Sequence, residues 1–148
     1  MATEETSYVS YLEAVLLHIG LLRLLGETRY GVFDRSLVES ALARPKQTAE
    51  YEGADLMRQA ATLCFGLIKN HLWVGGNKRT ATALLDEFLD RNGVDLTSDP
   101  AELIEMVLEV EAGRWQIAEI DAWHQNVNAP IDEAARVHHR QRPCELLF

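Results

Sequence analysis

A histidine, two glycines and two cationic residues gather near the middle of the chain, in the stretch His71-Leu72-Trp73-Val74-Gly75-Gly76-Asn77-Lys78-Arg79-Thr80. A lysine offers a compact positive charge and an arginine a bidentate fork, and both suit the charge that develops on a transferring phosphoryl group. A neutral imidazole can take the proton from an attacking hydroxyl. These residue types therefore predict a phosphate site in which His71 acts as a general base.

Helical patterns flank this stretch on both sides. Apolar residues recur at helical spacing from about residue 54 to residue 70, and again after Asn77, which can cap the second helix. The first turn of a helix leaves backbone N–H groups unpaired and carries the positive end of the macrodipole, so it attracts anions. We expect phosphate to bind at Gly76, Asn77, Lys78 and Arg79.

A purely structural interpretation fits the same residues. Lys69 and His71 at the end of one helix, and Asn77 at the start of the next, are ordinary capping residues. Spacing alone therefore supports the functional interpretation only slightly better than the structural one.

The patterns elsewhere predict an all-α protein of about six helices. Leucines on every face of the segment Tyr11 to Leu25 favour a central, buried first helix. A short second helix, capped by Asp34 or Ser36, is expected to end before Pro45, because the residue before a proline is pushed out of helical geometry. We therefore expect a polar loop over Pro45 to Gly53.

Shorter elements follow in the second half of the chain. Val94 to Leu96 is expected to be extended, Asp99-Pro100 opens a further helix, and a last helix runs from about Trp115 to Val127. Beyond this helix the apolar residues no longer recur at helical spacing. We predict one compact domain over residues 8–128, with the glycine stretch between its two central helices, and a tail over residues 129–148 that is an extra helix or disordered.

Composition narrows the classes of function. The chain has 148 residues, 47% of them hydrophobic, and a net charge of −9, which argues against direct binding of nucleic acid or of an anionic membrane surface. Cys64 and Cys144 are too few for a disulfide framework or a zinc site. The first seven residues are polar and acidic, unlike a secretory signal, and the longest apolar stretch is too short for a membrane span, so we expect a cytoplasmic protein.

The pattern His-x-x-x-x-Gly-Asn-Lys-Arg-Thr at positions 71–80 resembles the signature of the Fic/Doc superfamily, and in particular its death-on-curing (Doc) branch. Residues 31–45 and Asn92-Gly93-Val94 resemble the segments that flank this signature in Doc-like proteins, and so does His18 in the first helix. The resemblance covers about Tyr11 to Val127 and implies the all-helical Fic fold.

Doc-like toxins are similar to Fic enzymes in fold but act as protein kinases that phosphorylate elongation factor Tu and halt protein synthesis. The resemblance thus implies the toxin of a type II toxin-antitoxin system, with ATP as its substrate and with a cognate antitoxin and a translation factor as its partners. It makes His71 the general base of the reaction. It assigns phosphate binding to Gly76, Asn77, Lys78 and Arg79, of which the last two also stabilise the transferring group.

Lys78 favours phosphoryl transfer over adenylyl transfer. The Fic adenylyltransferases, which transfer AMP, have a glycine at this position and an arginine at the position of Thr82. In the Doc branch the nucleotide is thought to bind in the reverse direction, so that the γ-phosphate is transferred. Adenylyl transfer stays open as an alternative, and so does a degenerate Fic domain that only binds a partner or a nucleotide.

Gly75 departs from the family pattern. The family has an aspartate or glutamate at this position, which binds the Mg²⁺ that bridges the phosphates, and Mg²⁺ normally needs one or two protein carboxylates. We expect weaker metal binding and slower transfer. Three explanations stay open: another carboxylate substitutes, the activity has been lost or changed, or Gly75 is an introduced substitution that detoxifies the chain.

Other motifs carry less weight. Thr48 to Gly53 matches the pattern of an inhibitory Fic helix, but we attribute the match to chance, because the segment falls in the expected loop and is too close in sequence to the motif helix. His18 is expected to be a hydrogen-bonded core residue, and Trp73 to anchor the glycine stretch in the core. The adjacent His138 and His139 cannot share one helix face as metal ligands would.

Overall fold

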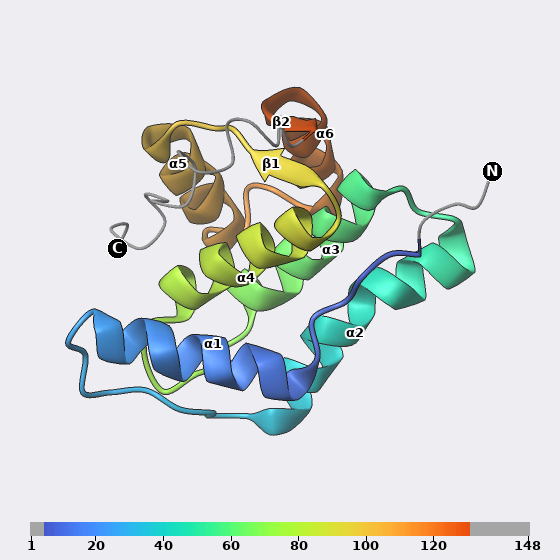
Figure 1. Ribbon diagram of the computed structural model, residues 1–148. Helices are drawn as coiled ribbons and strands as arrows, with labels where there is room; N and C mark the ends of the chain where they lie inside the picture. Colours follow the sequence, from blue (N-terminus) through green and yellow to red (C-terminus); the bar gives the residue numbers. More distant parts are fainter. Residues whose placement is uncertain (1–4, 131–148) are drawn as a thin grey trace.

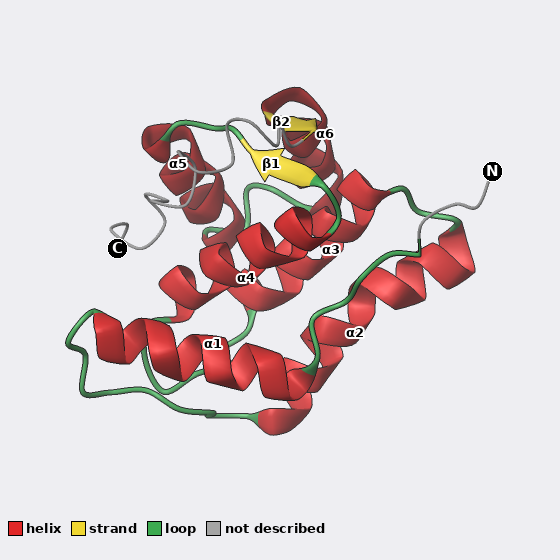
Figure 2. Ribbon diagram, in the orientation of Figure 1, coloured by secondary structure: helices red, strands yellow, loops and turns green. Residues whose placement is uncertain are grey.

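The computed structural model describes residues 5–130, which form six α-helices and one small two-stranded sheet (Figures 1 and 2). The predicted all-α class is therefore confirmed. The elements follow one another as α1 (Tyr11–Leu24), α2 (Arg35–Glu52), α3 (Leu56–Lys69), α4 (Asn77–Arg91), β1 (Val94–Leu96), α5 (Pro100–Glu111), α6 (Ile117–Val127) and β2 (Asn128–Pro130).

Helices α3 and α4 form the centre of the molecule (Figure 1). α3 contacts α2, α4, α5 and α6, and α4 contacts α1 and β1. The core between them consists of fully or almost fully buried apolar side chains, the largest of which are Trp73, Phe88, Leu63, Leu67, Leu84 and Leu85. As predicted, the glycine stretch joins these two central helices.

α1 lies at the edge of the molecule, not at its centre as predicted. It packs on α4 and α2 through one face, and the side chains of Leu12, Leu16 and Leu24 are 64%, 62% and 73% exposed. Its leucines occur on every face, so the sequence pattern gave no direction to the buried side. The buried face consists of Ala14, His18, Leu21 and Leu22.

α2 continues through Pro45 and ends at Glu52, so the prediction that it stops before this proline was wrong, as was the predicted loop over Pro45 to Gly53. A proline inside a helix removes one backbone hydrogen bond and costs about 3 kcal/mol. Here the Pro45 ring is buried with Val38 and Ala41 on the face toward α3, and that burial offsets the cost. Gly53, in the left-handed conformation at φ +64°, ends the helix instead.

Small residues let α2 and α3 approach each other closely. A β-carbon added to Gly66 of α3 would lie 3.3 Å from the β-carbon of Ala41 on α2, so no larger side chain fits between them without movement. α3 itself begins at Asp55, whose carboxylate accepts a hydrogen bond from the Arg58 N–H at 2.9 Å. The close packing fixes the direction of α3 and hence the place where its C-terminal end leads into the glycine stretch.

The two strands hold the second half of the chain against α4. Val94 to Leu96 is extended as predicted and pairs antiparallel with Asn128 to Pro130, a partner that the sequence did not predict. Ala129 and Pro130 therefore belong to β2, while the rest of the predicted tail, with His138, His139 and Cys144, lies outside the described residues. The domain boundary at residue 128 stays a prediction.

The helices and the buried cysteine bear on the expectations of no membrane span and no disulfide framework. Within residues 5–130, every helix is too short or too polar to cross a lipid bilayer. Cys64 is fully buried, and its burial raises the pKa of the thiol to about 12, so the group stays protonated at neutral pH.

Enlarging Ala41 should destabilise the fold through the contact between α2 and α3. We expect Ala41→Leu to lower the free energy of unfolding by about 1–3 kcal/mol, because the added carbons meet Gly66 and must displace α3. Urea denaturation followed by circular dichroism measures the change. The control is Gln47→Leu on an exposed position of the same helix, and equal losses in the two variants would show that the close approach is unimportant.

Candidate active site

The carboxamide of Asn77 closes the stretch between α3 and α4 into a compact loop, residues 70–77, which we call the motif loop. Its Oδ1 accepts hydrogen bonds from the backbone N–H groups of Leu72 at 3.1 Å and Trp73 at 3.0 Å, and its Nδ2 donates to the Trp73 carbonyl at 3.0 Å. The N-cap of α4 is Gly76 and not Asn77. The structure thus gives the Asn77 side chain a role within the loop, whereas its predicted contact with phosphate stays a prediction.

A second segment, residues 27–34 between α1 and α2, lies against the motif loop. The Leu72 carbonyl accepts hydrogen bonds from the N–H groups of Phe33 at 2.9 Å and Asp34 at 3.2 Å, and the Val74 N–H donates to the Gly31 carbonyl at 2.9 Å. This pairing fixes the loop backbone on both sides of Trp73. The sequence pointed to residues 31–45 only through the family resemblance, because nothing in their periodicity predicts a pairing so far along the chain.

Trp73 and His18 anchor the motif loop in the core, as expected for both. The two side chains are fully buried and stacked, with ring centroids 4.2 Å apart. The His18 Nε2 accepts a hydrogen bond from the Gly31 N–H at 2.9 Å, so its Nδ1 carries the proton and donates to the Thr80 hydroxyl at 2.7 Å. Burial lowers the pKa of His18 to about 4, which keeps the imidazole neutral.

Gly76 makes the sharp turn into α4. Its φ of +66° lies in the left-handed region, where a side chain is strained, and an added β-carbon would lie 2.7 Å from Leu22 Cδ2 on α1. No side chain caps this end of α4. The glycine therefore lets the chain turn closely past α1 into the first turn of α4, and anion binding by the N–H groups of this turn stays a prediction.

His71 lies on the exposed side of the motif loop, directly before the residues that Asn77 holds. Its ring meets the edge of Phe33, with centroids 4.8 Å apart and planes 83° apart, and the Phe33 side chain is 65% exposed. The imidazole is therefore open to a reactant from solution, as a general base must be. Phe33 lies in the segment that resembles Doc-like proteins, but the sequence assigned its side chain no role, because no periodic signal marks it.

Lys78 and Arg79 on the first turn of α4 each meet a carboxylate. The Lys78 Nζ lies 3.2 Å from the Glu111 carboxylate at the end of α5, and the Arg79 guanidinium lies 2.9 Å from the Glu27 carboxylate. Both carboxylates are about half exposed, and pairs of this kind contribute less than about 1 kcal/mol. An incoming phosphate can therefore compete for both cations.

Gly75 is covered by the backbone of the neighbouring segment. A β-carbon added to Gly75 would lie 2.6 Å from the Arg29 carbonyl oxygen, a distance that no real β-carbon tolerates unless the backbone moves. A carboxylate at this position would therefore require the segment around Arg29 to shift. No sequence pattern predicts that Arg29 lies here.

The described residues do not fit the magnesium site that the resemblance implied. Gly75 supplies no oxygen ligand from its side chain, and the nearby carboxylates of Glu27 and Glu111 are each paired with a motif cation. Within residues 5–130, no group of three or more histidine, cysteine, aspartate or glutamate side chains gathers, so this part of the chain has no preformed cage of protein ligands. We therefore derive no step of the chemistry through a metal ion.

The structure also places Thr82 and the segment Thr48 to Gly53, which matched the inhibitory-helix pattern. The Thr82 hydroxyl donates back to the Arg79 carbonyl at 2.9 Å and is buried, so it offers nothing to a nucleotide. Thr48 to Glu52 is helical, so the expected loop is no ground for discounting its match to an inhibitory helix. The segment leads into the N-terminal end of α3, whereas the motif loop follows the other end of this 14-residue helix, about 21 Å away. It therefore lies too far from the motif loop to inhibit it.

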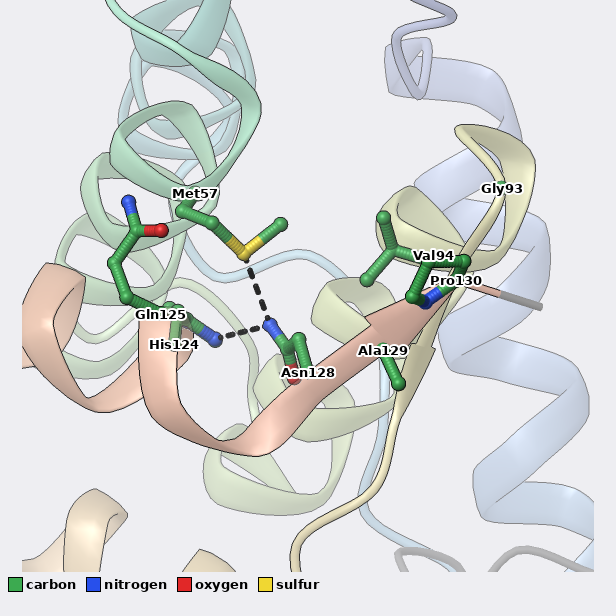
Figure 3. A pocket seen from close by; sticks show the side chains of 8 residues that line it. All are labelled: Met57, Gly93, Val94, His124, Gln125, Asn128, Ala129 and Pro130. Carbon is green, nitrogen blue, oxygen red and sulfur yellow. Dashed lines mark hydrogen bonds between the residues drawn. The ribbon is translucent and has the colours of Figure 1, made fainter.

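A separate pocket of about 210 Å³ opens between α3, α6 and the two strands (Figure 3). Asn128 Nδ2 donates to His124 Nδ1 at 3.0 Å and to Met57 Sδ at 3.3 Å. Burial lowers the pKa of His124 to about 3. Met57 is near the start of α3, so the pocket lies at the opposite end of this helix from the motif loop and is no part of the candidate active site.

Comparison with known proteins places the motif loop within a matched region. The model of the Fic/DOC family matches residues 8–89, more than half of the chain, and includes α1 to α3, the motif loop and most of α4. Toxin Doc of Mycolicibacterium smegmatis is 41% identical over 88 residues, which cover 57% of this chain and 65% of that protein. The chain thus spans slightly less than two thirds of the length of this relative.

Removing the Asn77 carboxamide should open the motif loop. We expect Asn77→Ala to lower the free energy of unfolding by about 2–4 kcal/mol, because three hydrogen bonds of about 1 kcal/mol each are lost and buried backbone groups lose their partner. Chemical denaturation measures the loss. Asn126→Ala, which removes one exposed hydrogen bond on α6, is the control and should cost far less; similar losses would contradict the role of Asn77.

The buried His18 should make stability depend on pH. Its folded pKa of about 4 lies below the unfolded value of about 6.5, so its contribution is complete above pH 6.5 and is lost as the pH falls toward 4. We expect the urea midpoint to fall between about pH 6.5 and pH 4.5, and to fall less in His18→Gln, which cannot titrate.

A matched variant separates titration from hydrogen bonding. Thr80→Val removes the acceptor of the His18 Nδ1 hydrogen bond but leaves the imidazole in place, so the slope of stability against pH should stay as steep as in the parent protein. If His18→Gln keeps the parent slope, another group causes the pH dependence.

Proposed function

The chain belongs to the Fic/DOC family, and on this premise we propose that it is a Doc-type toxin that transfers the γ-phosphate of ATP to a hydroxyl group of a translation factor similar to elongation factor Tu. The proposal includes a cytoplasmic location, because translation factors act there. The observation that carries it is the closed motif loop, which joins an exposed His71 to the cationic first turn of α4 through the side chain of Asn77.

The residues of the motif loop can divide the reaction among them. His71 takes the proton of the acceptor hydroxyl as its oxygen attacks the γ-phosphorus, and the bond from that phosphorus to the bridging oxygen of ADP breaks. The electron pair of this bond leaves with ADP. The N–H groups at the start of α4, with Lys78 and Arg79, bind the phosphate oxygens on which negative charge gathers.

The contacts of Lys78 and Arg79 are compatible with phosphate binding. Each cation meets a half-exposed carboxylate, which holds the side chain near the start of α4 at little energetic cost. A nucleotide phosphate carries more negative charge than one carboxylate and can accept from both cations at once. We therefore propose that Glu111 and Glu27 orient the two cations until the nucleotide replaces them.

Two residues favour transfer of the γ-phosphate over transfer of AMP. Lys78 stands where the adenylyltransferases have glycine, and it brings a positive charge to the first turn of α4. Thr82 stands where they have an arginine, and its short side chain is turned back onto the helix backbone. Adenylyl transfer remains the alternative reaction.

A degenerate domain that only binds is the second candidate function. It is favoured by Gly75, which lacks the carboxylate of the family and is covered by the Arg29 backbone. Such a domain would bind a nucleotide or a protein partner at the motif loop without transfer. For either function we propose a cognate antitoxin as a protein partner, with no direct role for nucleic acid or membrane.

The transfer reaction can be tested with labelled ATP and purified elongation factor Tu. We expect label from γ-labelled ATP, and not from α-labelled ATP, to appear on the factor, and we expect His71→Ala to lower the rate by about 10²- to 10⁴-fold. His71 is exposed and its ring contacts Phe33, so its removal should leave the fold intact, which a thermal melt checks.

Lys78→Ala and Lys69→Ala form a matched pair for the phosphate contacts. Each removes one lysine charge beside the motif loop, but Lys69 ends α3 and has no assigned role, so only Lys78→Ala should slow transfer.

Label from α-labelled ATP would indicate adenylyl transfer instead. ATP binding without transfer to any protein of a bacterial lysate would favour the degenerate domain.

A further inference from the structure

We propose that the motif loop binds nucleotide phosphates without a divalent metal ion, and that the side chain of Arg29 supplies the positive charge in its place. This inference rests on the proposed nucleotide binding at the motif loop. It concerns how this particular chain, with Gly75 in its loop, holds the phosphates.

The segment that carries Arg29 is fixed at both of its ends. At one end the Glu27 N–H donates to the Leu22 carbonyl at 2.9 Å, and the Glu27 carboxylate accepts from Arg79. At the other end the Gly31 N–H donates to the buried His18, and the Gly31 carbonyl accepts from Val74. Arg29, midway between them, is therefore held against the loop.

Arg29 occupies the space that a side chain at position 75 would need. Its carbonyl oxygen would lie 2.6 Å, and its β-carbon 3.4 Å, from a β-carbon added to Gly75. The β-carbon of Arg29 therefore lies in van der Waals contact with the place that the β-carbon of an acidic residue at position 75 would occupy. An arginine side chain is long enough to reach the first turn of α4 from there.

An acidic residue with Mg²⁺ and an arginine opposite a glycine place the same net charge beside the phosphates. An aspartate with a bound Mg²⁺ adds one net positive charge beside the phosphates, and an arginine opposite a glycine adds the same net charge. A guanidinium also donates to phosphate oxygens in a bidentate manner. The pair Gly75 and Arg29 can thus neutralise phosphate to the same extent as a carboxylate with its metal ion.

Arg29 is available for this role. It is exposed, and no carboxylate lies within ion-pair distance of its guanidinium in the part of the chain that the structure describes. The other two cations at the motif loop, Lys78 and Arg79, each meet a glutamate. A nucleotide can therefore engage Arg29 without first displacing a described carboxylate.

The test is the affinity for ATP, measured by calorimetry on the full chain in buffer with EDTA and in buffer with Mg²⁺. We expect the dissociation constant in EDTA to be lower than in Mg²⁺ or within about threefold of it. We expect Arg29→Ala to weaken ATP binding in EDTA by about tenfold or more, the usual effect of losing a charged hydrogen bond.

Arg58→Ala is the control for Arg29→Ala. It removes the same charge from the N-terminal part of α3, at the far end of this helix from the motif loop, and should leave the affinity within about threefold of the parent protein. Arg29→Lys keeps the charge but loses the fork, so its affinity should lie between those of Arg29→Ala and the parent.

The outcomes separate the inference from the function on which it rests. ATP binding that is more than about threefold tighter in Mg²⁺, or a loss in Arg29→Ala of less than about tenfold, overturns the role of Arg29 but leaves nucleotide binding standing. If ATP binds in neither buffer, the proposed function fails and the inference fails with it.

Discussion

The carboxamide of Asn77 is the contact on which the arrangement of the motif loop depends. Helix α4 begins at a glycine that has no capping side chain, so nothing at Gly76 itself fixes where the preceding backbone runs. Asn77 replaces a cap by reaching backwards, with three hydrogen bonds to the residues that follow His71. This side chain thereby ties the residues after His71 directly to the start of α4. Every chemical role assigned to the loop assumes this closure.

A second set of contacts connects the motif loop to the first third of the chain. His18 on α1 bonds Gly31 and Thr80 at once and stacks on Trp73, so a single buried ring joins α1, the segment 27–34 and α4. The inward face of α1 is thus held by hydrogen bonds of His18 as well as by the burial of Ala14, Leu21 and Leu22. The two buried anchors, His18 and Trp73, are thus separate from the exposed His71 to which the proposed chemistry is assigned.

The sequence predicted the helical class, the motif loop between α3 and α4, and the anchoring roles of Trp73 and His18, because these depend on local periodicity or on a family pattern. It failed at Pro45, where burial against α3 outweighs a local helix breaker. It failed for the orientation of α1, whose leucines occur on every face. It could not place Arg29, Glu27 or Glu111 at the site, because contacts between distant segments leave no local signal.

The backbone that covers Gly75 couples two segments that lie far apart in the sequence. Because the Arg29 carbonyl lies against this glycine, an acidic residue placed at position 75 by one mutation would produce a clash and not a metal ligand. Such a residue would also require a change in the segment 27–31, which is tied to α1, α4 and the motif loop. The two positions are thus epistatic: the effect of a mutation at position 75 depends on the residues around Arg29.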